Sequence, residues 1–193
     1  GAFIAVTTYG STSAAESTIE RVRRIHDRVT GTAPDGRAYR ANDPHLLEWV
    51  HCVEVDSFLA AYRRYGAAPL SAPAADEYVR DMAVIARALG VVDPPTTTAA
   101  LTARLRSYRR ELRSTPEARE AVRYLVVSAP LPLPARPAYG VLTAAAVGLM
   151  PVWSRLPLLL PWLPISERAV VQPAGRVLVN TLRWALAPDS PHR

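Results

Sequence analysis

The 193-residue sequence contains no lysine, a single cysteine (Cys52), only nine glycines and two phenylalanines. One cysteine cannot form an internal disulfide, so nothing in the sequence requires an oxidising compartment. The low glycine content excludes a collagen-like or loop-rich chain. No charged segment followed by an apolar core opens the chain, so no signal peptide is visible and we expect a cytoplasmic protein. The first six residues are already apolar, which we interpret as the start of a processed or truncated chain.

Arginine supplies every basic side chain, and the net charge is +6. Half of the residues are hydrophobic, and the length suits one domain with a real core, so we treat 1–193 as a single domain. A nucleic-acid surface usually combines arginine with exposed aromatic residues or a known motif, and neither is present here. We therefore predict no nucleic-acid partner. Peripheral association with an anionic membrane remains open, because the arginines would be attracted to it.

Apolar residues recur at helical spacing along most of the chain, and no alternating strand pattern exceeds four residues, so we predict an all-α fold. A capping box at Ser13–Glu16 begins the first expected helix, and Gly31 ends it. Residues 34–36 form a turn in the loop that follows. The next helix begins at Asp43-Pro44, where proline suits the first helical position. The expected helices span residues 13–31, 43–66, 71–90, 98–113, 115–127 and 166–187.

Proline divides the C-terminal third from this helical core, residues 1–128. Residues 129–137 hold four prolines and form a linker to the apolar C-terminal helices. The linker and these helices together make up residues 129–193. Between 139 and 164 the unbroken apolar part is about 12 residues, short of the roughly 20 that span a membrane. We predict a buried helical hairpin here, interrupted by prolines. The alternative is a patch that dips into one face of a membrane.

His51 lies on an apolar face of the helix predicted for residues 43–66. Leu47, Val55, Phe58 and Tyr62 share that face, because residues four and seven apart align on a helix. A buried imidazole must find a partner, since an unpaired polar group costs about 1–3 kcal/mol. His51 is therefore either a core histidine bonded to a backbone carbonyl or a metal ligand.

Two glutamates, Glu48 and Glu54, lie three residues on either side of His51. Either carboxylate could accept the second ring N–H of a metal-bound imidazole. Glu48-x-x-His51 also has the form used in di-iron carboxylate bundles, but those sites need two copies of the motif and this chain has one. Glutamates that are solvated, or that support a metal ligand without binding the metal, are the simpler interpretation, and a di-iron enzyme stays as an alternative.

The remaining chemistry-bearing residues are sparse. His26 borders the apolar stripe of the first expected helix, three residues after Arg23, so it faces a pocket or the edge of a core. His45 is expected to be exposed, and His192 is near the C-terminus. Cys52 and His51 point about 100° apart on a helix and cannot form a nucleophile–base pair. No glycine-rich phosphate loop and no Gly-x-Ser-x-Gly elbow is present.

Several of these segments together resemble the MpaB and latex-clearing-protein (rubber oxygenase) family. The resemblance covers about residues 2–127 and is weaker in the apolar tail, where residues 131–134 look like a family feature. It is carried by Val22–His26, Val29, Gly31, Asp35-Gly36, Tyr39, Ala41, Asp43-Pro44, Trp49–His51 and Ser57–Tyr62.

This resemblance implies a globin-like, all-helical protein that binds haem b and acts on an apolar, alkene-bearing or isoprenoid-like molecule with dioxygen. His51 would correspond to the axial iron ligand, with Phe58 as a cofactor contact on the same face. Arg23 would be the distal arginine, with His26 beside the open face of the iron. A neutral buried imidazole suits haem iron, and a nearby cation would stabilise negative charge on bound oxygen.

The sequence also departs from the family. It has no lysine to take the distal role of that residue in latex-clearing members. The family extends upstream of the first residue here, so we expect that helices walling the pocket are missing. A helical lipid- or prenyl-binding protein without catalysis is therefore the alternative to a haem oxygenase, with the di-iron enzyme as the second alternative.

Overall fold

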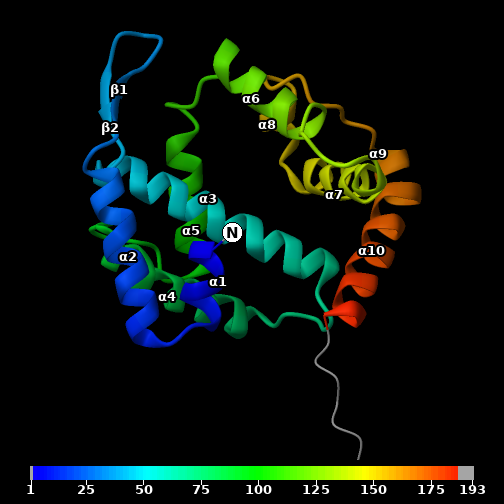
Figure 1. Cartoon of the computed structure of the whole chain (residues 1–193), viewed down its shortest axis with the longest axis horizontal. Coiled ribbons are helices and arrows are strands. Elements are labelled where there is room, and N and C mark those ends of the chain that lie inside the picture. Colours follow the sequence, from blue (N-terminus) through cyan, green and yellow to red (C-terminus); the bar gives the residue numbers. More distant parts are fainter. Residues whose placement is uncertain (1, 187–193) are drawn as a thin grey trace, which may run out of the picture. The chain divides into compact units, whose positions relative to one another are not determined.

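Helices make up most of the computed structural model, which describes residues 2–186 (Figure 1). This confirms the predicted all-α class. The described residues divide into two compact units, each of which we describe by itself. The first unit holds residues up to 59 and 68–112, and the second holds 60–67 and the chain from 113 onward. Helix α3 (Pro44–Tyr65) contributes its longer N-terminal part to the first unit.

The first unit is built on a core shared by three helices. Helix α1 (Ala2–Tyr9) packs on α2 (Thr12–His26), α2 packs on α4 (Ala72–Leu89), and α4 packs on α5 (Thr98–Tyr108). Helices α3, α4 and α5 supply the side chains of the core cluster. These are Cys52, Val55 and Leu59 from α3, Ala75 and Val79 from α4, and Leu101 from α5.

The local signals at the ends of α3 and α4 work as the sequence predicts. Asp43 accepts a hydrogen bond from the His45 backbone N–H at 2.8 Å, and α3 begins at the next residue, Pro44. Ser71 caps α4 by accepting from the backbone N–H of residue 74. Gly90 ends α4 with φ of +114°, a left-handed conformation that glycine adopts without steric cost.

The first expected helix differs from the prediction at both ends. Ser11, not Ser13, is the N-cap of α2 and accepts from the backbone N–H of residue 14. The helix ends at His26, because the chain then turns into a two-stranded antiparallel hairpin, β1 (Thr30–Thr32) and β2 (Ala38–Arg40). Gly31 is therefore a strand residue opposite Tyr39, and a Cβ there would lie 2.6 Å from the tyrosine oxygen.

The second unit contains the end of α3 and the elements after residue 112. The first helix of this unit, α6, matches its prediction closely and has Thr115 as its N-cap. Helix α5 of the first unit, by contrast, stops at Tyr108, five residues before its predicted end. Helix α7 packs against η2 and α10. The elements are α6 (Pro116–Val126), η1 (Leu133–Ala135), α7 (Arg136–Leu149), α8 (Val152–Arg155), α9 (Pro164–Ser166), η2 (Glu167–Val171) and α10 (Gln172–Ala185).

The predicted buried hairpin over residues 139–164 is wrong. Only α7 is a long helix there, and the second half is the single turn α8 followed by non-helical chain. Prolines 151, 157, 161 and 164 remove backbone donors, which prevents a second helix from forming. The segment is also only partly buried: Val147 and Leu160 are buried, whereas Leu156, Leu159 and Trp162 are exposed. Helix α7 finds its helical partner in α10 instead.

The last helix begins close to the predicted position but is not regular. Residues 167–171 form the π-helical turn η2, and α10 follows from Gln172 to Ala185. Pro173 has no N–H to offer the carbonyl four residues earlier, which accounts for a widened turn just before it. The predicted end at residue 187 lies outside the described residues, as does His192. Among the described helices, none is long and apolar enough to cross a membrane.

Candidate functional site

His51 is the centre of the candidate site. Its side chain is on the buried side of α3, and the residue is only 8% exposed. The Nε2 atom is buried and has no hydrogen-bond partner among the described residues. Burial lowers the pKa of His51 more than the negative charge of Glu48 raises it, so the ring is neutral near pH 7. A neutral imidazole with a free buried nitrogen is the form that a metal ion binds.

Glu48, one turn before His51 on α3, is also buried. Its carboxylate forms an ion pair with Arg104 of α5, and it accepts a 2.8 Å hydrogen bond from the Tyr108 hydroxyl. Arg104 also approaches Asp93 at 3.7 Å. A buried carboxylate is tolerated when a cation and hydrogen bonds compensate for its lost hydration. Because the Nε2 atom of His51 is unpartnered, neither Glu48 nor Glu54 binds that nitrogen.

The other titratable neighbours do not supply a nucleophile. Cys52 is fully buried, and its burial raises the pKa of the thiol to about 12. The thiol therefore stays protonated, in agreement with the exclusion of a Cys–His pair. Burial also raises the pKa of Glu54, which lies near Tyr78 of α4.

Arg23 and His26, the predicted distal residues, lie on α2. Arg23 is exposed, whereas His26 is partly buried and its Nδ1 atom has no hydrogen-bond partner among the described residues. The apolar stripe that His26 borders is partly exposed, since Ile25 and Val29 are 53% and 42% exposed. The structure thus supplies a second imidazole with an orphaned buried nitrogen.

Phe58 and Tyr62 were expected on the same inward face as His51, but they are 39% and 45% exposed. The buried face of α3 is centred instead on Cys52, Val55 and Leu59. His51 lies at the edge of that face, because each residue advances the helix by about 100°. Phe58 stays on the His51 side of α3, just outside the core.

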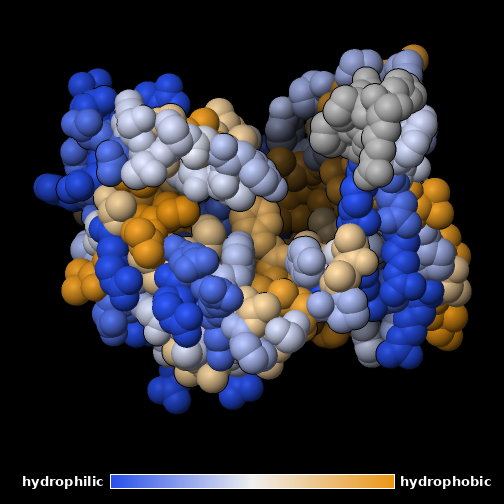
Figure 2. Space-filling model, turned by 90° about the horizontal axis from the view of Figure 1, so that it is seen from below, coloured by the Kyte–Doolittle hydropathy of each residue, from blue (hydrophilic) through white to orange (hydrophobic). Residues whose placement is uncertain are grey.

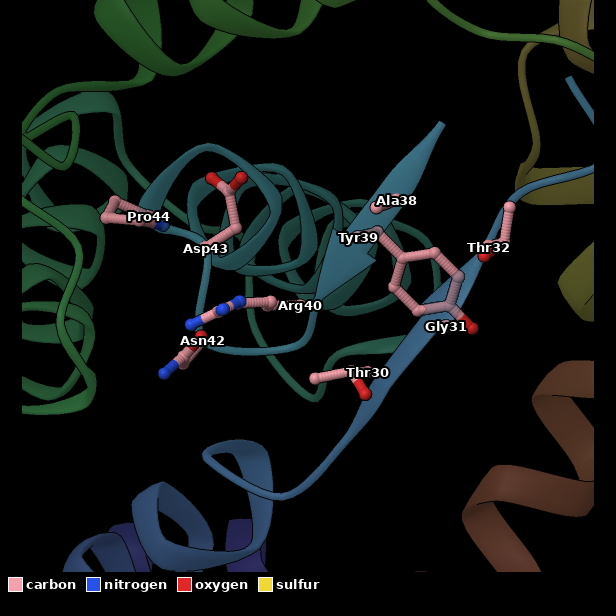
Figure 3. Close-up of a pocket in the computed structure, with 9 residues that line it drawn as sticks. All are labelled: Thr30, Gly31, Thr32, Ala38, Tyr39, Arg40, Asn42, Asp43 and Pro44. Carbon is pink, nitrogen blue, oxygen red and sulfur yellow. The ribbon is translucent and has the colours of Figure 1, made fainter. Parts of the chain in front are cut away.

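An open pocket beside the β hairpin is separate from this cluster (Figure 3). Tyr39, Arg40, Asn42 and Asp43 supply its larger polar groups, and none of the predicted site residues lines it. Asn42 donates a 2.8 Å hydrogen bond to Asp27, so part of this rim is already occupied by internal contacts.

A protein-only metal centre finds no support in residues 2–186, where no group of three or more His, Cys, Asp and Glu side chains converges. The di-iron alternative therefore lacks a ligand set in this part of the chain. A single imidazole with a free nitrogen fits a porphyrin-held metal, which needs one protein ligand rather than four.

Arg104 and Tyr108 are the residues that the sequence did not single out. Neither residue belongs to a motif in the sequence, and Arg104 is one of 23 arginines. The available signal was their spacing, because residues four apart on one helix face present two polar tips to the same place. Nothing in the local sequence indicates that Glu48, more than fifty residues earlier, is the group they meet.

Comparisons with curated proteins and with solved structures gave no match. A family model described as "ER-bound oxygenase mpaB/B'/Rubber oxygenase, catalytic domain" matches residues 1–184, nearly the whole chain. An oxygenase takes dioxygen and a small-molecule substrate, as the sequence resemblance implies. The chain therefore belongs to the family of mpaB and rubber oxygenase catalytic domains.

Proposed function

We propose that this chain is a haem b-dependent oxygenase that acts on an apolar, alkene-bearing or isoprenoid-like molecule, with His51 Nε2 as the axial iron ligand. The observation that carries the proposal is the buried Nε2 atom without a partner. Leaving such an atom unpaired costs about 1–3 kcal/mol, and a metal bond removes that cost. Membership of an oxygenase family supports the reaction class.

The residues present fit this group. His51 would hold the iron, while the apolar neighbours on α3 keep water away from its ring. Haem b, when bound, supplies an iron centre that activates dioxygen. From α2, the guanidinium of Arg23 would stabilise negative charge, and the free Nδ1 of His26 would hold or accept a proton. Phe58 is proposed as an apolar contact of the cofactor.

Haemin titration of the purified protein, followed by the Soret absorbance, tests the axial ligand. We expect saturable binding near one haem per chain for the wild type and its loss in His51→Gly. Added imidazole should restore the spectrum of His51→Gly, because the small ligand fills the vacated position. Cys52→Ala is the matched control, since it truncates a buried neighbour without removing a ligand.

An unchanged Soret band in His51→Gly, or no saturable binding by the wild type, would overturn the proposal.

His26→Gln is a separate measurement on the loaded protein. We expect it to keep the haem but to slow dioxygen consumption with an isoprenoid alkene, because it changes the proposed distal side only.

The surface of the second unit favours a second function, a lipid- or prenyl-binding protein associated with an anionic membrane. Within its described residues this unit has ten arginines against three carboxylates. Its exposed apolar side chains include Trp162, Leu163, Ile165 and Trp184. Hydrophobic and strongly hydrophilic residues lie side by side at the right of Figure 2, where α10 lies in Figure 1.

Co-sedimentation with lipid vesicles tests this second function. We expect more binding to vesicles that contain phosphatidylserine than to pure phosphatidylcholine, and weaker binding at high salt. Trp162→Ser should reduce binding, and Val84→Ser, an exposed apolar position of α4, serves as the control. Equal behaviour of the two variants would exclude a docking role for this surface.

A further inference from the structure

The polar groups around Glu48 form a connected chain from the buried part of α3 to the surface. Tyr108 places its hydroxyl 2.8 Å from Glu48 Oε2 and 3.0 Å from the backbone carbonyl of His45. The same hydroxyl lies 3.4 Å from His45 Nδ1, and His45 Nε2 lies 2.7 Å from Glu111 Oε2. Two ring contacts, with His45 and Trp49, fix the tyrosine ring from the side.

Glu48 is held from two directions on its two oxygens. Arg104 contacts Oε1 and Tyr108 donates to Oε2, both from α5. Arg104 is more exposed than the carboxylate, with 34% of its side chain accessible against 11% for Glu48. The anion is therefore the deeper member of the pair. Charge-assisted bonds of this kind are stronger than neutral ones, so the carboxylate has little freedom to rotate.

The fixed carboxylate lies one helical turn from the imidazole of His51. Residues three apart on a helix are neighbours on its surface. Both residues are buried, at 8% exposure each, so little water separates the charge of Glu48 from this ring. In a buried environment such an interaction is less screened than in water.

We propose that Arg104 and Tyr108 are positioning residues, which hold Glu48 as a fixed anion beside His51 and so set how strongly this imidazole donates electrons to a bound iron. The inference rests on the proposed function, because it needs His51 to be the axial ligand. Groups that surround a metal ligand tune its basicity and the reduction potential of the metal. A negative charge near the ligand favours ferric over ferrous iron.

A charge cycle measured on the haem-loaded protein tests this inference. Glu48→Gln removes the buried anion and leaves Arg104 with only the exposed Asp93 as a partner, so the reduction potential should rise and ferric haem should bind about 10–100-fold more weakly. Arg104→Gln leaves Glu48 uncompensated, so the potential should fall. The double variant should return toward the wild-type potential.

The opposite signs separate electrostatic positioning from loss of structure, because a merely loosened fold would move both single variants in the same direction. Tyr108→Phe is the second variant, and it should lower the potential less than Arg104→Gln does, because it removes a neutral hydrogen-bond donor from Glu48 and not a charge. Tyr78→Phe is its control, a core-packed tyrosine on α4 that lies near Glu54 instead. Circular dichroism of each apo variant checks that the helices persist.

Two failures are distinguishable. If the wild type binds no haem through His51, the proposed function is wrong and this inference falls with it. If haem binds through His51 but the two single variants shift the potential in the same direction, or not at all, then only the positioning role of Arg104 and Tyr108 is overturned.

Discussion

Each unit of the molecule contains an Arg–Glu ion pair, but the buried partner differs. In the first unit the carboxylate of Glu48 is the deeper group, and Arg104 is one-third exposed. In the second unit the guanidinium of Arg155 is the deeper group, at 4% side-chain exposure, and it pairs with Glu167 at 2.6 Å. The two pairs therefore place charges of opposite sign inside their units.

The surroundings of the buried charge explain what each pair does. Arg155 also donates to the carbonyls of Gly148 and Met150, both at 2.8 Å, at the C-terminal end of α7. A helix C-terminus carries partial negative charge and unpaired carbonyls, so this guanidinium serves as its cap. Glu48 instead lies one turn from an imidazole with a free nitrogen. The Glu48–Arg104 pair therefore lies beside the candidate site, whereas the Arg155–Glu167 pair stabilises the end of α7.

Removal of Arg155 should have the largest effect on stability. Arg155→Met removes the cation that pairs with Glu167 and the donor to two carbonyls, and breaking a buried pair in this way costs about 3–5 kcal/mol. Urea unfolding followed by tryptophan fluorescence in a Trp49→Phe background would report this loss of stability, because the remaining three tryptophans belong to the second unit. Arg168→Met, at an exposed position, should change stability by no more than about 0.5 kcal/mol. Equal midpoints for the two variants would show that Arg155 has no capping role.

The second-largest effect on stability should come from the difference between the hydrophobic cores of the two units. The largest fully buried side chains, Leu101 and Val79 among them, belong to the first unit. Leu101→Ala should cost about 2–5 kcal/mol, because the cavity it leaves is enclosed by three helices. Leu142→Ala on α7 removes the same atoms from a side chain that is 49% exposed, and should cost under about 1 kcal/mol. Thermal unfolding measured by circular dichroism compares them, and similar losses would contradict the difference between the two cores.

Two helices of the first unit, α3 and α4, could be predicted closely because their end signals are local. Asp43-Pro44, Ser71 and Gly90 each act on residues within one turn, so the bounds of α3 and α4 follow from the sequence. The β hairpin did not follow, because strands of three residues are too short to show an alternating pattern. The capping prediction at Ser13 failed because Ser11 offers the same hydroxyl two residues earlier.

The features that the sequence did not reveal depend on contacts between residues far apart along the chain. The burial of His51 follows from helical periodicity, but its neighbours Arg104 and Tyr108 come from another helix. The burial of Arg155 depends on carbonyls at the end of α7 and on Glu167, which hydropathy does not reveal. Apolar composition likewise predicted a buried hairpin at residues 139–164, because it cannot distinguish a core segment from an exposed one.

A smaller, pH-dependent effect should arise from Cys52, which belongs to the first unit. Burial raises the pKa of its thiol from 9.0 to about 12. Between these values the unfolded chain releases the proton and the folded chain keeps it, so stability falls as pH rises above 9. The loss at pH 10 should be about 1.4 kcal/mol, and it should be absent from Cys52→Ala. Urea unfolding of both forms at pH 8 and pH 10 checks this, and parallel pH slopes would contradict the shifted pKa.

The smallest predicted effect compares two helix caps of the same chemistry in the two units. Ser71 caps α4, which has buried residues, whereas Thr115 caps α6, which has none. Loss of either cap should destabilise its own helix by about 1 kcal/mol. In Ser71→Ala this cost should appear in cooperative unfolding, because α4 is part of the core. In Thr115→Ala we expect it only as faster amide hydrogen exchange within α6, since a helix without buried side chains can open by itself. Ser71→Asn and Thr115→Ser keep a capping group and should restore both values. A lowered global midpoint in Thr115→Ala would show instead that α6 unfolds together with the rest of the second unit.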